Sequence, residues 1–262
     1  MPRSVSGSAI THWTVEAVLQ SEIRVVNILV FQHIACEHPG IFRQFFSEAG
    51  INWQAVALEA GDAIPDLHKF DALWVMGGPM DVWDIDTCPW LVAEKEAIRH
   101  WVHELNRPYL GLCLGHQLLA DALGGACEVQ PTPEIGIMEV SLADAARDDP
   151  LFQGIAPKIK CLQWHSVAVT TPPEDAVLLA SSPECAWQAM RVGSHAWGAQ
   201  FHVELQDTTI SEWSEVPAYA QALDQVKGPG ALKEMEDQAA QHMAQFKGNA
   251  RILFDNFCRV VG

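Results

Sequence analysis

The sequence Tyr109-Leu110-Gly111-Leu112-Cys113-Leu114-Gly115-His116-Gln117 joins a short apolar strand to a helix. Glycines on both sides of Cys113 relieve the crowding of a sharp strand-to-helix turn, so the thiol is lifted clear of the sheet. The helix N-terminus beneath the thiol favours a thiolate, because exposed N–H groups and the helix dipole stabilise negative charge. The N–H of Leu114 can point at a developing oxyanion. The stretch therefore predicts a nucleophile elbow, with a buried cysteine in a tight turn as the alternative.

Outward from this turn, strand-like and helical segments alternate through the first half of the chain. The strand-like segments are residues 25–34, 54–58, 72–76 and 109–112, and the helical segments are residues 42–49, 90–105 and 118–123. This alternation is typical of a parallel sheet that is covered by helices on both faces.

The second half of the chain has a different pattern. Strand-like segments with only short connections follow one another at residues 136–142, 159–169, 176–182, 186–192 and 196–203, and residues 232–261 are helical. These strands predict antiparallel hairpins that join the same sheet. We expect an α/β fold with a flavodoxin-like open mixed sheet, mostly parallel and flanked by helices. Residues 1–24 form an N-terminal extension, 25–205 the main domain, and 206–262 a C-terminal helical extension packed on it.

The composition excludes several classes of protein. Among 262 residues, 16 are Lys or Arg and 33 are Asp or Glu, which gives a formal net charge of −17. An acidic chain of this kind argues against nucleic acid and anionic membrane surfaces as partners. The apolar runs are too short to span a bilayer, and no secretory signal is recognisable. Seven widely spaced cysteines without a C-x-x-C pair indicate a reduced cytoplasm and no zinc ribbon.

A nucleophilic cysteine needs a base, and His202 is the best candidate among the histidines. It lies in Phe201-His202-Val203-Glu204, at the end of an apolar strand. Residues i and i+2 of a strand share a face, so Glu204 can hold one ring nitrogen while the other faces Cys113. Such strand ends are where open α/β sheets place their sites. The alternative is a polar strand terminus at the surface.

Other polar and aromatic groups near the motifs have more ordinary interpretations. His33, Glu37 and His38 lack a known metal-ligand spacing, so we expect loop residues near the site and no metal. His165 is either a second general base or a residue that shapes the pocket. Three tryptophans near the motifs pack in the core or line a pocket for a bulky amine: Trp83, Trp90 and Trp164. The remaining cysteines are expected to be structural, and the acidic stretch 143–150 a solvated loop.

Four motifs in this order resemble the class I glutamine amidotransferases, the Cys-His-Glu family. They are Gly77-Gly78-Pro79-Met80, residues 111–117, Trp164-His165-Ser166 and Gly198-Ala199-Gln200-Phe201-His202-Val203-Glu204. The resemblance covers about residues 25–205 and is nearest to the amidotransferase domain of GMP synthases and its free-standing relatives.

The resemblance implies a mechanism for the triad. Cys113 attacks the γ-carboxamide carbon of glutamine or of a related γ-glutamyl amide or peptide. His202 takes the thiol proton and later protonates the departing amine, while Glu204 holds His202. Water then hydrolyses the γ-glutamyl thioester and releases glutamate.

The resemblance also implies which groups bind the substrate. The main-chain N–H groups of Gly78 and Leu114 form the oxyanion hole. Gln117, with the main chain at Ser166 and Val167, holds the amino and carboxylate groups of the glutamyl moiety.

The fate of the nitrogen stays open at this point. The sequence has neither a G-x-x-x-x-G-K-[ST] loop nor a G-x-G-x-x-G fingerprint, and we expect no cofactor. Fewer than 60 residues follow Glu204, too few for an ATP-dependent synthetase domain. The chain is therefore expected to be a hydrolase of γ-glutamyl amides, or a glutaminase subunit that delivers ammonia to a separate synthetase. A catalytically silent regulatory protein is the third alternative, against which the complete set of Cys113, His202 and Glu204 counts.

Overall fold

A single mixed sheet runs through the computed structural model, which describes residues 25–262. The expected N-terminal extension, residues 1–24, lies outside the described residues. The sheet order is β2-β1-β3-β4-β9-β8-β7-β5-β6. The strands are β1 (Asn27–Gln32), β2 (Asn52–Ala57), β3 (Ala72–Val75), β4 (Tyr109–Leu112), β5 (Ala126–Leu142), β6 (Lys158–Thr171), β7 (Ala176–Ser181), β8 (Ala189–Val192) and β9 (Ala196–Ala199).

Helices follow or precede most of these strands. The α-helices are α1 (Phe42–Ala49), α2 (Trp90–His100), α3 (Leu114–Ala122), α4 (Thr209–Ser214), α5 (Pro217–Lys227) and α6 (Ala231–Val261). Short 3₁₀ turns lie at η2 (Leu58–Ala60), η3 (Leu67–Lys69) and η5 (Asp144–Arg147), and a π-helical turn, η4 (Trp101–Leu105), continues α2. No helix in residues 25–262 is both long enough and apolar enough to cross a bilayer.

The pairing of the strands confirms the expected open mixed sheet flanked by helices. Strands β2, β1, β3, β4 and β9 pair in parallel. Strands β8, β7, β5 and β6 continue the same sheet in antiparallel pairings. The antiparallel part is as extensive as the parallel part, because β5 is much longer than its apolar pattern indicates. Pro131 and Pro133 interrupt that pattern, and β5 passes them with a register shift between Val129 and Glu134.

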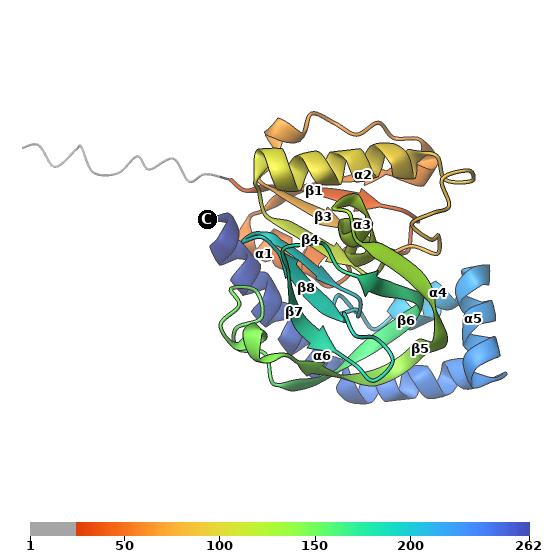
Figure 1. Cartoon of the computed structure of the whole chain (residues 1–262). Helices are drawn as coiled ribbons and strands as arrows, with labels where there is room; N and C mark the ends of the chain where they lie inside the picture. Colours follow the sequence, from red (N-terminus) through yellow and green to blue (C-terminus); the bar gives the residue numbers. More distant parts are fainter. Residues whose placement is uncertain (1–24) are drawn as a thin grey trace, which may run out of the picture.

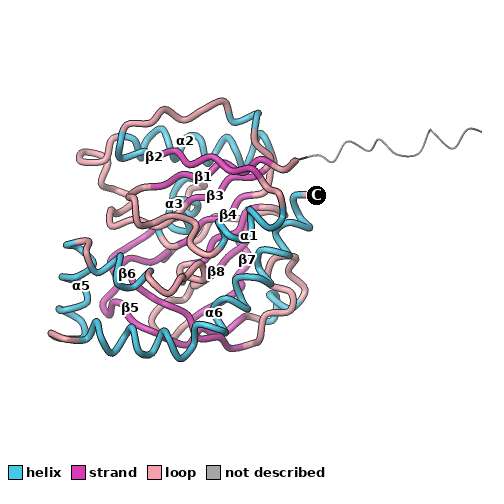
Figure 2. The backbone as a smooth tube through the Cα atoms, turned by 180° about the vertical axis from the view of Figure 1, so that it is seen from behind, coloured by secondary structure: helices cyan, strands magenta, loops and turns pink. Residues whose placement is uncertain are grey.

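Both faces of the sheet are covered (Figure 1). Phe42 and Phe46 of α1 and Phe254 of α6 pack against one face, together with Trp74 of β3. Helices α2 and α3 cover the other face. Burial of side chains on both sides explains why the parallel strands are continuous apolar runs. Figure 2 shows α6 and α1 from behind, on the face opposite α2 and α3.

A third cluster of buried side chains lies under the C-terminal helices. Trp213 of α4, Tyr219 of α5 and Phe246 of α6 pack there against Leu162 and Trp164 of β6. This cluster brings the segment after residue 205 to the ends of β5 and β6, where α5 is drawn in Figure 1.

The structure differs from the sequence-based expectation at two further places. The expected strand at 196–203 ends at Ala199, and His202 beyond it makes only an isolated bridge to Leu162. The acidic stretch 143–150 is not a solvated loop throughout. Asp149 is buried and accepts hydrogen bonds from Trp197 and Arg191 at 2.9 and 2.7 Å, because both donors extend from the neighbouring strands β9 and β8.

Candidate active site

Cys113 sits at the turn between β4 and α3, as the sequence predicts. Its backbone has φ 52° and ψ −104°, a conformation that L-residues rarely adopt. The turn is held from both sides. The Cys113 N–H donates to the carbonyl of Ala199 at 2.8 Å, and the Gly115 N–H donates to the carbonyl of Met76 at 3.2 Å. Because Cys113 immediately precedes the first turn of α3, it lies at the N-terminus of that helix, next to the N–H of Leu114.

Two glycines make this turn possible. A Cβ at Gly115 would lie 2.1 Å from the carbonyl oxygen of Val75, and a Cβ at Gly111 would lie 2.3 Å from the carbonyl oxygen of Gly115. Both neighbours are backbone atoms that cannot give way. The elbow therefore depends on the absence of side chains on either side of the cysteine.

His202 and Glu204 meet in the manner the sequence predicts, although the strand ends before them. The Nδ1 of His202 lies 2.7 Å from Oε1 of Glu204. The other carboxylate oxygen accepts from the N–H of Val203 at 2.8 Å, and the N–H of His202 donates to Leu162 at 2.9 Å. Trp213 of α4 packs edge-on against the imidazole, with ring centroids 4.5 Å apart. These contacts fix the ring, so that Nδ1 is committed to Glu204.

The charges around His202 favour its protonated form. Burial by itself lowers the pKa of this histidine, but the carboxylate of Glu204, bonded to Nδ1, and the nearby sulfur of Cys113 together raise it well above the usual range. The arrangement suits an imidazolium at His202.

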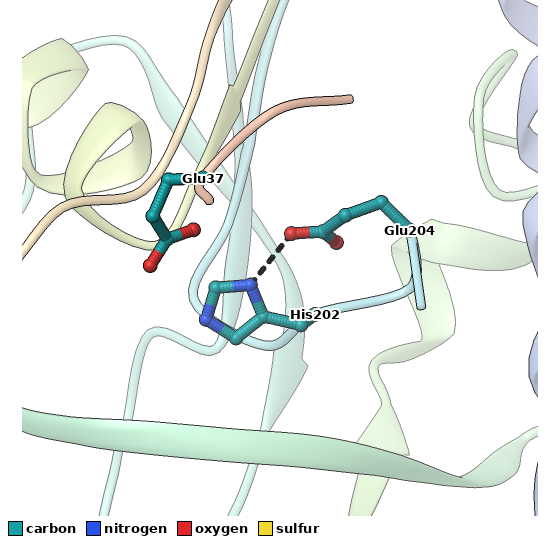
Figure 3. A group of neighbouring side chains, drawn as sticks. All are labelled: Glu37, His202 and Glu204. Atoms are coloured by element: carbon teal, nitrogen blue, oxygen red, sulfur yellow. Dashed lines mark hydrogen bonds and ion pairs between the residues drawn. The ribbon is translucent and has the colours of Figure 1, made fainter. Parts of the chain in front are cut away.

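A third ionisable group, Glu37, faces the same imidazole. Figure 3 shows its carboxylate beside the ring, on a different side from Glu204. The hydroxyl of Tyr219 donates to Oε1 of Glu37 at 2.6 Å, while the buried Oε2 has no hydrogen-bond partner among the described residues. Burial raises the pKa of Glu37, although His202 and the Tyr219 hydroxyl oppose that shift.

Oxygen or nitrogen atoms of Glu37, His202 and Glu204 approach within 4.8 Å of one another. Such spacing would suit a metal ion, but Nδ1 of His202 and Oε1 of Glu37 are already engaged by Glu204 and Tyr219. We therefore interpret the three groups as a hydrogen-bonded His202–Glu204 pair with the carboxylate of Glu37 beside it.

A cavity of about 240 Å³ opens above Cys113. The sequence-predicted binding residues all line it: Gly78, Leu114, Gln117, Ser166 and Val167. His202 and Glu204 are not among its lining residues and are almost completely buried behind it. The structure thus brings every candidate site residue into one neighbourhood.

Gln117 connects the cavity to the nucleophile through a buried chain of amides. Its Nε2 donates to the carbonyl of Val167 at 3.0 Å and to Oε1 of Gln200 at 3.1 Å. The Nε2 of Gln200 lies 3.5 Å from the sulfur of Cys113. Gln200 belongs to the fourth sequence motif, but nothing in that motif indicates a contact with the cysteine.

The remaining candidates occupy supporting positions. His33 lies in the loop after β1, as expected, but it is buried, with 2.8 Å from Nδ1 to the carbonyl of Gly77 and 2.9 Å from Nε2 to Glu94. His165 lines the cavity, where its Nδ1 lies 3.0 Å from the carbonyl of Val167 and its Nε2 3.2 Å from Glu134. Of the three tryptophans, Trp164 lines the cavity.

Several other cysteines are unsuited to nucleophilic chemistry. Burial raises the pKa of Cys36 and Cys258 to about 11 and that of Cys127 and Cys185 to about 12. These groups remain thiols at neutral pH, and thiolate is the nucleophilic form.

A family model described as glutamine amidotransferase class-I matches residues 42–212. The chain belongs to the class I glutamine amidotransferase family. Members of this family are typically glutamine-hydrolysing enzymes. The matched region includes the elbow at Cys113, the parts of β5 and β6 that line the cavity, and the His202–Glu204 pair.

Curated relatives of the family are similar over most of this region. One subunit of the glutamine-hydrolyzing GMP synthase of Sulfolobus acidocaldarius is 34% identical over 159 residues, which are 59% of this chain and 78% of the relative. The glutamine amidotransferase-like protein YfeJ of Salmonella typhimurium is 30% identical over 179 residues, which are 66% of this chain and 73% of the relative.

Solved structures of amidotransferases have the same fold. A glutamine amidotransferase from Thermotoga maritima superposes with a TM-score of 0.80 at 24% identity, covering 91% of this chain and 99% of that one. A glutamine amidotransferase from Methylobacillus flagellatus gives a TM-score of 0.77 at 25% identity, covering 91% of this chain and 96% of that one.

The sequence-based prediction of the active site did not include three residues that the structure places there. Trp213 packs on the histidine, Tyr219 lines the cavity, and Glu37 accepts a hydrogen bond from the tyrosine and lies beside the histidine. Only Glu37 had a sequence signal, as part of the His/Glu cluster after the first strand. Trp213 and Tyr219 lie in the C-terminal extension, before the helix predicted at residues 232–261, and no sequence signal pointed to them.

Proposed function

We propose that this amidotransferase hydrolyses the γ-glutamyl C–N bond of glutamine or of a γ-glutamyl amide through a thioester on Cys113. The observation that carries the proposal is the His202 ring, held at Nδ1 by Glu204 and close enough to Cys113, which lines the cavity, for the sulfur to raise the pKa of the ring. A nucleophile, a base and a group that orients the base are thereby present together.

The first half of the reaction forms the thioester. The thiolate of Cys113 attacks the γ-carbonyl carbon, and the carbonyl electron pair moves to oxygen, where the N–H groups of Gly78 and Leu114 stabilise it. The C–N bond then breaks as the protonated His202 gives its proton to the departing nitrogen. The products of this half are a γ-glutamyl thioester and a free amine or ammonia.

The second half consumes one water molecule. His202, now neutral, accepts a proton from water as the oxygen adds to the thioester carbon. The C–S bond breaks, glutamate leaves, and the thiolate and imidazolium are restored. Gln117 and the main chain at Ser166 and Val167 hold the glutamyl amino and carboxylate groups throughout.

A second candidate function is delivery of ammonia to a separate synthetase. It is favoured by the similarity to a protein named as one subunit of a glutamine-hydrolyzing GMP synthase, most of whose length this chain matches. The chemistry at Cys113 is the same in both cases, and only the fate of the nitrogen differs. A catalytically silent regulatory role is disfavoured by the intact Cys113, His202 and Glu204 cluster.

The test is release of glutamate from glutamine and from a panel of γ-glutamyl amides and peptides, with the protein kept reduced. Cys113→Ala is expected to reduce turnover by at least about 10⁴-fold, while Cys88→Ala, a half-buried thiol outside the cavity, leaves it unchanged. No glutamate from any compound would refute the proposal.

Capture of a stable synthetase partner decides between the two candidates. Glutaminase activity that appears only in such a complex would establish ammonia delivery. Full activity of the isolated protein on a γ-glutamyl amide would establish the hydrolase.

A further inference from the structure

One wall of the cavity is an apolar stripe on α5. Ala218, Ala222 and Val226 lie four residues apart and line the cavity together with Tyr219. Residues four apart share one face of a helix. Val226 is 37% exposed although it is apolar, so the stripe is not simply part of the core.

The end of the β5–β6 hairpin extends the same apolar surface. Pro133 and Ile135 of β5 and Trp164 of β6 line the cavity next to α5. Trp164 packs on Tyr219 with ring centroids 5.7 Å apart, and its Nε1 donates to the Tyr219 carbonyl at 3.3 Å. These contacts give the wall a fixed shape.

The glutamyl moiety does not need this wall. Under the proposed function, Gln117 and the main chain at Ser166 and Val167 bind its charged groups, and all three positions lie on α3 and β6. The α5 stripe is therefore left for the amine half of the substrate, beyond the scissile bond at Cys113.

The described lining residues of the cavity include no lysine or arginine. Asp81 would repel a second carboxylate, Gln225 of α5 is uncharged, and the ring nitrogens of His165 face the Val167 carbonyl and Glu134. Lys227 at the end of α5 lines a separate cavity around Gly136 and Ile137. Lys95, near the Asp81 side, is engaged by the Val82 carbonyl at 2.9 Å and by Asp121 at 2.8 Å. A carboxylate on the amine half would be desolvated without a counter-charge, which is costly.

We infer that the amine half of the substrate is apolar and carries no carboxylate. The substrates are γ-glutamyl amides of alkylamines or arylalkylamines, in preference to γ-glutamyl amino acids and peptides. This inference rests on the proposed function, because it concerns the leaving group of the same reaction.

A matched pair of compounds tests the inference on the wild-type protein. The γ-glutamyl amide of 2-phenylethylamine and γ-glutamylphenylalanine differ only by one carboxylate. We expect kcat/KM to be higher for the amide by about tenfold or more, since an unpaired buried charged group costs at least this much. The γ-glutamyl amide of methylamine lacks both the carboxylate and the phenyl ring, so it measures what the apolar group contributes to kcat/KM. It is expected to be a poorer substrate than the phenylethyl amide.

A charge placed on the stripe gives an independent test. Val226→Lys adds a cation at an exposed cavity position on a helix, where lysine is well tolerated. The ratio of kcat/KM for the phenylethyl amide to kcat/KM for γ-glutamylphenylalanine should fall by about threefold to fivefold. Gln221→Lys adds the same charge on an exposed part of α5 outside the cavity and should leave the preference unchanged.

The possible results separate this inference from the proposed function. Equal or faster hydrolysis of γ-glutamylphenylalanine by the wild type would overturn the inference and leave the proposed function standing. A Val226→Lys variant whose preference matches that of Gln221→Lys would also overturn it. No glutamate from any of these compounds or from glutamine would overturn both.

Discussion

Residues 27–124 and residues 126–261 contribute to the same cavity in different ways. The first region, which holds β1 to β4 and α1 to α3, supplies Cys113 and the backbone groups of two tight turns at Gly78 and Leu114. The second region supplies side chains that approach from far along the chain, namely His202, Glu204 and Tyr219.

The difference lies in what fixes each group. The elbow is fixed locally, by glycines that allow the turn and by backbone hydrogen bonds to Met76 and Ala199. The histidine is fixed by tertiary contacts with Glu204 and Trp213. Substitutions in the second region should therefore disturb orientation and protonation, while substitutions at the elbow should disturb backbone strain.

The largest effect is expected for Glu204→Gln in the second region. The amide keeps the shape of the side chain but cannot stabilise an imidazolium, so kcat/KM should fall by about 10³-fold. Steady-state release of glutamate measures this. Glu212→Gln, at an exposed acid on α4 3.9 Å from His38, is the control and should change kcat/KM little. A fall of less than tenfold for Glu204→Gln would show that the carboxylate does not support the base.

The only two tyrosines of the chain give a matched comparison of the regions. Tyr219→Phe removes a hydrogen bond to a buried carboxylate, and Tyr109→Phe removes one at 2.7 Å to the carbonyl of Gly115. Because bonds to charged groups are stronger, unfolding free energy should fall by about 2 kcal/mol for Tyr219→Phe and about 1 kcal/mol for Tyr109→Phe. Urea denaturation at pH 7 measures both, and the reverse order would contradict the expectation.

Glu37 links the two regions, and its titration should be visible in stability. Its pKa in the folded protein is raised above the ordinary value of 4.5, chiefly by burial. The folded state therefore binds the proton more tightly, and the stability that this provides is complete below pH 4.5 and lost as pH rises through the folded pKa. Glu37→Gln does not titrate, so its stability relative to wild type should rise with pH above 4.5.

The slope of that rise is at most about 1.4 kcal/mol per pH unit. Urea denaturation between pH 4.5 and 8 measures it. Glu48→Gln is the control, because hydrogen bonds from Gln44 and Arg251 lower the pKa of Glu48 below 4.5, so that its stability relative to wild type should stay nearly level across this pH range. A relative stability of Glu37→Gln that stays constant with pH would contradict the assignment.

The smallest effect concerns backbone strain at the elbow of the first region. Glycine at position 113 can adopt this backbone conformation without steric cost, whereas the Cβ of alanine retains the cost that cysteine has. We expect the unfolding free energy of Cys113→Gly to exceed that of Cys113→Ala by about 0.5–1 kcal/mol, after the greater chain entropy of glycine is included. Thermal and urea denaturation measure the difference. A more stable alanine variant would show that the turn is not strained.

The first region was predictable from sequence to a large degree. The helix at residues 42–49 and the strand at residues 109–112 have the predicted bounds, because Gly50 ends the helix and the elbow ends the strand. Strands that are buried on both faces of the sheet are continuous apolar runs, and such runs are easy to recognise in the sequence. The elbow was also accessible, since its turn is encoded in local sequence, whereas the position of Gly78 was inferred only from the resemblance to the amidotransferase family.

The second region was predictable only in part. His202 and Glu204 were found from their spacing, yet the strand thought to hold them ends at Ala199. Asp149 and Tyr219 have partners more than 40 residues away, at Arg191 and Glu37. Helical periodicity shows that a side chain faces inward, and it carries no information about which distant group will meet it. The apolar wall on α5 was missed for this reason.

The distance along the chain between Cys113 and Tyr219 also has a consequence in time. Chains are synthesised at about 5–20 residues per second, so the 106 residues from position 113 to position 219 require about 5–20 seconds. During that interval the β4–α3 turn has emerged while its histidine, its second carboxylate and its cavity wall have not. The cysteine gains its base and its full cavity wall only once residues 202–226 have been made, so until then the nascent chain carries a thiol without its base.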